Sequence, residues 1–166
     1  MHMALVEASQ HESLVDLMHE MSGFYNEHLV VSRDDVRANL LDNLLAPASP
    51  VRLVVATDDA GTVVGFAAVA LFHSLIDPTP GQGAQLLMKE LYVREASRGQ
   101  GVGKALMGWV ARHALAHGCV RIDWNVSASN REGQAFYRSL NAQHVAGRLS
   151  YRLGGEYLAR LAGEDE

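Results

Sequence analysis

This chain of 166 residues has a single cysteine, no excess of basic charge and no long apolar run. The single cysteine, Cys119, cannot form an internal disulfide, which agrees with a reducing compartment. The net charge of −5 argues against a general nucleic-acid binder, because such a protein needs a basic surface to displace counterions from phosphates. The longest apolar stretches, such as Val63 to Phe72, are too short or too interrupted to cross a bilayer, and no charged-then-apolar leader opens the chain. We therefore expect a soluble, cytoplasmic protein with no membrane segment and no nucleic-acid partner.

Hydrophobic residues make up 48% of the chain, which is enough to bury one sizeable core. We find no repeat, linker or low-complexity tract, so we expect a single domain over residues 1–166. Apolar periodicity and turn residues predict strands at 3–6, 51–57, 62–72, 84–93, 120–126, 143–146 and 149–153, and helices at 10–22, 101–117, 130–140 and 156–161. A further helix begins at Ser32 and ends before Pro47. This order of elements predicts an α/β fold.

A glycine-rich segment from Arg98 to Lys104 joins the strand expected at 84–93 to the helix expected at 101–117. At such a junction the backbone amides can point together at an anion near the positive end of the helix, and glycine lets the backbone approach phosphates closely. Arg98 can add a charge-assisted hydrogen bond, and Lys104 a further positive charge. A pyrophosphate fits this segment. The alternative is a glycine loop that only turns the chain.

Two common phosphate-binding motifs do not match this segment. The dinucleotide-binding pattern needs its third glycine at the place where this chain has Lys104. A P-loop needs glycine in place of Arg98 and serine or threonine in place of Ala105. Both nucleotide-binding interpretations are therefore excluded.

Three short patterns follow one another along the chain. They are Leu91-Tyr92-Val93, then Arg98-x-x-Gly101-x-Gly103, then Asn130 followed seven residues later by Tyr137. Together they resemble the acetyl-CoA core of the GNAT N-acetyltransferase superfamily, strongly so from about residue 86 to residue 146. The resemblance implies a mixed, mainly antiparallel sheet with helices on both faces and a cofactor wedge where two strands splay apart.

Further short segments resemble one branch of that superfamily, the spermidine/spermine and thialysine acetyltransferases. These segments are Asp77-Pro78, Asp123-Trp124-Asn125 and Glu156-Tyr157-Leu158. That branch usually carries two acidic residues just before its counterpart of Leu91. Here the first of these places holds Lys89 and the second holds Glu90. The departure puts polyamine specificity in question.

The resemblance also assigns residues to acetyl-CoA. It implies that the strand ending at Val93 bulges, so that backbone groups near Tyr92 and Val93 bind the pantetheine arm. The residues implied for the pyrophosphate are Arg98, Gly99, Gln100, Gly101, Val102, Gly103 and Lys104. Backbone amides at the strand end would stabilise the developing oxyanion, and no metal is required.

Asn130 and Tyr137 are two helical turns apart, so they share a face that Gly133 leaves open. The resemblance implies that Asn130 contacts the cofactor arm. It also implies that the Tyr137 hydroxyl protonates the departing thiolate as a catalytic acid. The alternative for Tyr137 is a core aromatic residue whose hydroxyl lies at the surface.

An attacking ammonium must lose a proton, and Glu90 is our candidate for the group that removes it. Glu90 shares strand parity with Met88 and Tyr92, and the alternative is an ordinary solvent-facing or ion-paired carboxylate. Glu90 is also a candidate substrate contact. Tyr25, Glu27 and Asp77 are further candidate substrate-binding residues, although plain surface positions explain each of these three.

Two histidines, His113 and His117, are one helical turn apart, but they lack the further ligands of a zinc motif. We therefore expect them on a helix surface. Apolar periodicity assigns four aromatic residues to the core: Phe66, Phe72, Trp109 and Phe136.

The function expected from this reasoning is acetyl-CoA-dependent N-acetylation of a primary amine, a small cationic metabolite. One alternative is a non-catalytic acyl-CoA-binding sensor or interaction module. Another is a protein-lysine acetyltransferase. The family resemblance also suggests a homodimer.

Overall fold

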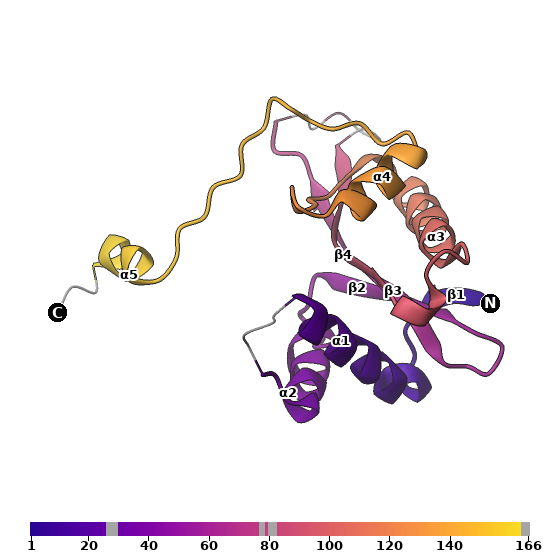
Figure 1. Cartoon of the computed structure of the whole chain (residues 1–166). Coiled ribbons are helices and arrows are strands. Elements are labelled where there is room, and N and C mark those ends of the chain that lie inside the picture. The colour runs from indigo at the N-terminus through magenta and orange to yellow at the C-terminus, as the bar shows by residue number, and fades with distance from the viewer. Residues whose placement is uncertain (26–29, 77–78, 80–82, 164–166) are drawn as a thin grey trace. The chain divides into compact units, whose positions relative to one another are not determined.

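The computed structural model describes residues 1–25, 30–76, 79 and 83–163 (Figure 1). The candidate substrate residues Glu27 and Asp77 lie outside these ranges. The chain divides into two compact units, Met1–Val126 and Ser127–Glu166. The expectation of one domain over the whole chain stays a prediction. Within the described ranges, none of the helices has the length and apolar character needed to cross a bilayer.

The first unit is built on a five-stranded mixed sheet. Its strands are β1 (His2–Leu5), β2 (Val51–Thr57), β3 (Val63–His73), β4 (Ala84–Val93) and β5 (Cys119–Asp123). They follow the order β1-β2-β3-β4-β5, with β5 parallel to β4 and all other neighbours antiparallel. This architecture confirms the α/β class with a mainly antiparallel sheet.

Helices cover both faces of this sheet (Figure 1). They are the 3-10 turn η1 (Ala8–Gln10), α1 (His11–Tyr25), α2 (Arg33–Ala38), the π-helical continuation η2 (Asn39–Leu44), the 3-10 turn η3 (Glu95–Ser97) and α3 (Val102–Ala116). Ser32 caps α2 through a capping box with Asp35, as the sequence predicts for this helix start. On one face, α1 and η2 bury Leu14, Leu17 and Leu40 against Phe66.

The opposite face packs against α3, and Gly65 of β3 marks the closest approach. A Cβ at Gly65 would lie 3.1 Å from side-chain atoms of Val102 and Leu106, and 3.2 Å from the carbonyl oxygen of Tyr92. Because successive strand residues point to opposite faces, Gly65 and Phe66 serve the two different layers. Glycine at this place lets α3 lie close to the sheet.

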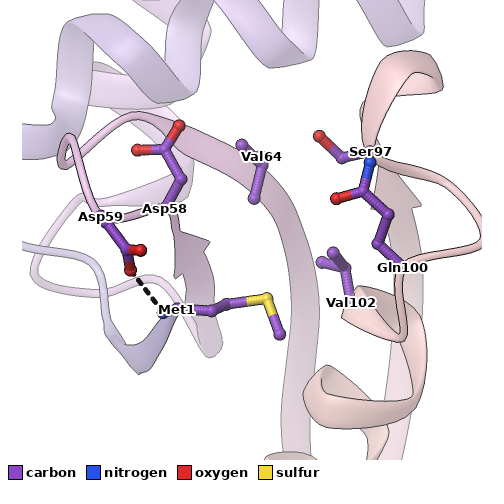
Figure 2. Close-up of a pocket in the computed structure, with 7 residues that line it drawn as sticks. All are labelled: Met1, Asp58, Asp59, Val64, Ser97, Gln100 and Val102. Atoms are coloured by element: carbon purple, nitrogen blue, oxygen red, sulfur yellow. Dashed lines mark hydrogen bonds and ion pairs between the residues drawn. The ribbon is translucent and has the colours of Figure 1, made fainter.

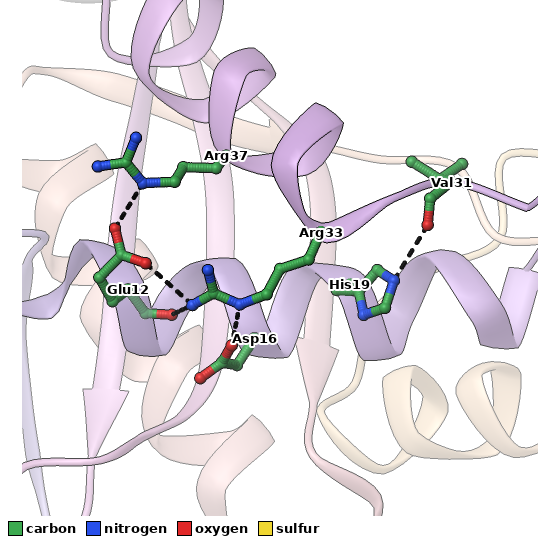
Figure 3. Close-up of polar contacts among 6 residues, drawn as sticks. All are labelled: Glu12, Asp16, His19, Val31, Arg33 and Arg37. Atoms are coloured by element: carbon green, nitrogen blue, oxygen red, sulfur yellow. Dashed lines mark hydrogen bonds and ion pairs between the residues drawn. The ribbon is translucent and has the colours of Figure 1, made fainter.

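A group of ion pairs holds α2 against α1 (Figure 3). Arg33 contacts Asp16 at 2.7 Å and Glu12 at 2.9 Å, and Arg37 contacts Glu12 at 2.6 Å. These side chains are about half exposed, so each pair alone contributes little stability. Together they connect the α2 residues Arg33 and Arg37 to the first half of α1.

The second unit contains two helices, α4 (Arg131–Ser139) and α5 (Glu156–Ala162), close to their predicted ranges. The strands predicted at 143–146 and 149–153 are wrong, because the structure has no strand there. Strands need hydrogen-bonded neighbours, and within the described part of this unit there is no strand to pair with. The apolar side chains that suggested those strands are exposed: Val145, Leu149, Tyr151 and Leu153.

Of the four aromatic residues expected in the core, Phe66 is fully buried. The prediction is wrong for Phe72, which is 49% exposed because β3 runs beyond its helical cover over its last three residues. Trp109 and Phe136 are half-buried, each at the side of its helix.

Candidate active site

The glycine segment forms a turn between β4 and α3, at the place that the sequence predicts. Gly99 and Gly101 have φ angles of 74° and 84°, which L-residues with a side chain rarely adopt, and open space surrounds both. Gly101 is the N-cap of α3, and the amide of Ala105 donates to its carbonyl at 3.0 Å. The amides before Ala105 therefore lie in the first turn, where a helix offers them no acceptor. This end of a 15-residue helix attracts anions.

The polar side chains of the turn do not all point toward these amides. The Gln100 side chain donates back to the carbonyl of Ala96 at 3.0 Å. Arg98 donates from Nε to the carbonyl of Val93 at 3.1 Å, so its side chain runs back along β4. Lys104 is exposed within the first turn of α3.

One side of β4 is open beyond its first residues. β3 pairs with β4 over its whole length, whereas β5 pairs only with Ala84 to Leu87. From Met88 to Val93, no strand of the described residues occupies the β5 side. β5 ends at Asp123, opposite Leu87, so the second half of β4 has no strand on this side.

The hydrogen-bond pattern shows which peptide groups face the opening. The amide of Arg94 donates to Val64 across the sheet, and Gly65 lies opposite Val93. In an antiparallel pair, residues alternate between groups that face the partner strand and groups that face away from it. The N–H and C=O of Val93 and Leu91 therefore face the open side, whereas those of Tyr92 face β3.

The irregularity in β4 lies at Lys89. Ala68 pairs with Glu90 and its neighbour Val69 pairs with Met88, so Lys89 is an extra residue. The bulge places Glu90 on the same face as Tyr92 and turns Met88 to the opposite face. The predicted shared parity of Glu90 with Met88 is therefore wrong, since one inserted residue reverses the alternation.

Glu90 lies on the α1 face of the sheet beside Tyr25, the last residue of α1. Partial burial raises the pKa of Glu90, while the amide of Leu91, a hydrogen-bonding contact with Tyr25 and the charge of Lys89 act to lower it. Burial also raises the pKa of the Tyr25 hydroxyl, and the Glu90 charge adds to this rise. A half-buried carboxyl with a raised pKa exchanges its proton nearer to neutral pH than an ordinary glutamate.

A cluster around Glu20 supports the end of β4, and sequence reasoning missed it. The Glu20 carboxylate accepts from the Tyr92 hydroxyl at 3.1 Å, from Arg94 at 3.0 Å and from the Glu95 amide at 3.2 Å. Burial, followed by the Glu20 charge, raises the pKa of Tyr92 to about 12, so this phenol remains a donor. No sequence signal separates Glu20 from the other acidic residues of an amphipathic helix.

Asn130 and Tyr137 belong to the second unit. Asn130 caps α4 by accepting from the Gly133 amide at 2.8 Å, and a Cβ at Gly133 would lie 2.7 Å from the Asn130 side chain. The space at Gly133 is therefore filled by Asn130 itself, which corrects the expectation of an open face. Tyr137 is half-buried, with its ring 5.1 Å from that of Phe136.

A pocket of about 360 Å³ lies beside the glycine turn (Figure 2). It is lined by Met1, Asp58, Asp59, Val64, Ser97, Gln100 and Val102. Asp58 accepts from the amides of Ala60 and Thr62 in the β2–β3 hairpin, and Asp59 pairs with the N-terminal amine at 2.9 Å. Two carboxylates in the wall disfavour a phosphate, so we do not assign the cofactor to this pocket.

A comparison with protein-family models shows which family has this open strand and glycine turn. The model of the Acetyltransferase (GNAT) family matches residues 14–142, most of the chain. The chain belongs to the GNAT acetyltransferase family. The matched range includes β4, the turn and α3, and it extends through α4 with Asn130 and Tyr137.

Curated relatives of this GNAT chain carry one recurring name. It is 30% identical to the thialysine N-epsilon-acetyltransferase of Mus musculus, across 64% of this chain and 78% of that protein. The enzyme of the same name from Sus scrofa is 27% identical, across 65% of this chain and 79% of that protein. These relatives place the GNAT chain near the branch that its sequence resembles.

Solved structures share the GNAT fold. An integron cassette protein from the mobile metagenome of V. cholerae has a TM-score of 0.88 and 28% identity, covering 97% of this chain and 96% of its own. An aminoglycoside N-acetyltransferase solved with CoA has a TM-score of 0.66 and 19% identity, covering 93% and 100%. At that identity the second likeness shows the fold alone.

Two histidines of this GNAT chain, His113 in α3 and His117 at its C-cap, form a row of ring contacts with Trp109. Trp109 and His113 have ring centroids 4.9 Å apart, and His113 and His117 are 4.3 Å apart. Burial lowers the pKa of His113, and the charges of His117 and Arg52 lower it further. Among the described residues, no three His, Cys, Asp or Glu side chains are grouped closely enough to hold a metal ion.

Proposed function

We propose that this GNAT protein transfers the acetyl group of acetyl-CoA directly to the primary amine of a small cationic metabolite. The observation that carries the proposal is the open side of β4, which leads into the glycine turn at the start of α3. An extended arm with amide groups suits the first feature, and a pyrophosphate suits the second.

The residues present fit acetyl-CoA. The amide of Val93 and the carbonyls of Leu91 and Val93 offer a donor and acceptors to the pantetheine arm, as a neighbouring strand would. The Leu91 amide contacts the Glu90 carboxyl instead. Gly99 and Gly101 leave room where side chains would obstruct a phosphate. The first amides of α3, with Arg98 and Lys104, provide positive potential for the pyrophosphate. When bound, acetyl-CoA supplies an activated acetyl thioester.

The chain's own residues manage the protons. Glu90 accepts a proton from the acceptor ammonium, directly or through water, and its raised pKa brings it closer to that task at neutral pH. Tyr25 holds the Glu90 side chain in place. Tyr137 donates a proton to the departing thiolate, the role that the family resemblance implies for it.

The proposed acceptor class rests on charge and on the named relatives. Glu90 faces α1 beside Tyr25, whose ring contacts that of Phe24, and a carboxylate beside an aromatic ring attracts a cation. Two relatives are named for an amino acid analogue with a side-chain amine. Lys89 places a cation next to Glu90, and for this reason we do not propose spermidine in particular. A cytoplasmic location and a homodimer remain part of the proposal.

A panel of amines tests the function. Thialysine, lysine, diamines, aminoglycosides and lysine peptides are each incubated with acetyl-CoA, and release of the CoA thiol is measured together with the acetylated product. We expect turnover with a small cationic amine. Binding of acetyl-CoA without turnover of any amine would favour the non-catalytic acyl-CoA module, and turnover of lysine peptides alone would favour a protein acetyltransferase.

A further inference from the structure

Arg98 occupies a position that the proposed cofactor arm needs. Its Nε donates to the carbonyl oxygen of Val93 at 3.1 Å. That carbonyl faces the open side of β4, because the adjacent amide of Arg94 is the one directed at Val64 of β3. A side chain of the protein thus uses one of the acceptors on the open side of β4.

Two aromatic rings hold the guanidinium in this place. The Arg98 Cζ lies 5.1 Å from the centroid of the Phe24 ring and 5.5 Å from that of Tyr92. Tyr92 is itself fixed by its hydrogen bond to Glu20. Arg98 therefore has a defined resting position against β4 and α1, with a hydrogen bond and two cation–π contacts, although it is exposed.

The same residue starts the glycine turn, one position before Gly99. From there a long, flexible side chain can reach either the end of β4 or an anion at the first amides of α3. It cannot do both, because a guanidinium stacked on Phe24 lies back along the strand. Arg98 and an arm at Val93 both approach this carbonyl from the open side of β4, so they compete for it, and binding of the arm with release of Arg98 forms one exchange.

We infer that Arg98 makes this site selective for thioesters that carry a pyrophosphate. This inference rests on the proposed binding of acetyl-CoA. In the structure Arg98 covers the Val93 carbonyl, and an arm bound there displaces it. A ligand with a pyrophosphate gives the displaced guanidinium a new charge-assisted partner, whereas a short thioester such as S-acetylpantetheine leaves it without one.

The test measures the binding of S-acetylpantetheine and of CoA to the unaltered full chain and to its Arg98→Met variant. Removing the guanidinium frees the Val93 carbonyl, so we expect S-acetylpantetheine to bind about tenfold more tightly. CoA loses a phosphate contact, so we expect it to bind about tenfold more weakly. Opposite shifts for two ligands that share one arm are the signature of the exchange.

Lys104→Met is the matched control, since it removes a positive charge from the same turn without touching Val93. It should weaken the binding of CoA and leave the affinity for S-acetylpantetheine unchanged. If Arg98→Met fails to fold, as judged by circular dichroism, Arg98→Lys replaces it. This variant should also bind S-acetylpantetheine more tightly than the unaltered protein does. Affinity for S-acetylpantetheine that is unchanged, reduced or undetectable in the Arg98 variant would overturn the inference while CoA binding stands. Failure of CoA to bind the unaltered protein would instead remove the proposed function and the inference together.

Discussion

Among the single residues beside the open strand, Glu90 has a raised pKa, from which we expect opposite effects on activity and on stability. Its pKa is raised because the carboxyl is partly withdrawn from water. A carboxyl with a folded-state pKa above its unfolded value favours folding when protonated, so its effect on stability becomes unfavourable as the pH rises through the folded value. As a base, Glu90 is useful only after that same deprotonation.

Glu90→Gln therefore separates the two effects. We expect kcat/KM for the preferred amine to fall by at least about tenfold above pH 7, and the rising limb of its pH profile to change. The melting temperature should rise at pH 8 and stay unchanged at pH 4, where Glu90 is protonated. Unaltered pH profiles with full activity would remove Glu90 as the base.

Tyr137→Phe tests the proposed acid. The variant keeps the ring against Phe136 and removes only the hydroxyl, so kcat should fall by about a hundredfold while the affinity for acetyl-CoA changes little. Rapid-quench measurement of the acetyl-transfer step, together with calorimetric titration of the cofactor, checks both parts. A chemical step as fast as in the unaltered protein would contradict the assignment.

At the scale of elements, the contact between β3 and α3 sets the position of the glycine turn. A side chain at Gly65 would press on Val102 and Leu106 and on the fixed carbonyl of Tyr92. We expect Gly65→Val to lower the free energy of unfolding by about 1–3 kcal/mol. Gly23→Ala is the control, because Gly23 is an exposed helix residue with open space around it and should gain about 0.5–1 kcal/mol. Urea unfolding curves measure both, and equal stability of the two variants would contradict this packing account.

The sequence predicts an element when its signal comes from neighbouring residues, and misses features that depend on residues far apart in the chain. The strand, the glycine turn and α3 follow from neighbouring residues and are predicted together. The bulge at Lys89 is a matter of register against β3, which strand alternation alone does not reveal. The segments at 143–146 and 149–153 have strand-like residues, but a strand also needs a partner. Glu20 escapes prediction because its partners, Tyr92 and Arg94, are more than seventy positions away in the chain.

For the whole molecule, the central claim is that the glycine turn of this GNAT protein holds the pyrophosphate of acetyl-CoA. Gly101 is the position at which that claim is easiest to isolate. It has a positive φ angle, and a Cβ placed on it would have no neighbouring atom within 4 Å, so substitutions strain the backbone but meet no other group. Asparagine and aspartate tolerate this backbone region about equally and have the same shape.

The most direct measurement is calorimetric titration of acetyl-CoA into the unaltered protein, Gly101→Asn and Gly101→Asp. Gly101→Asn has the same backbone strain and bulk as Gly101→Asp, so it measures how much affinity for acetyl-CoA is lost through shape alone. Gly101→Asp adds a negative charge beside the pyrophosphate and should weaken binding by at least a further tenfold or abolish it. Equal affinities of folded Gly101→Asn and Gly101→Asp proteins for acetyl-CoA would contradict the placement of the pyrophosphate at this turn.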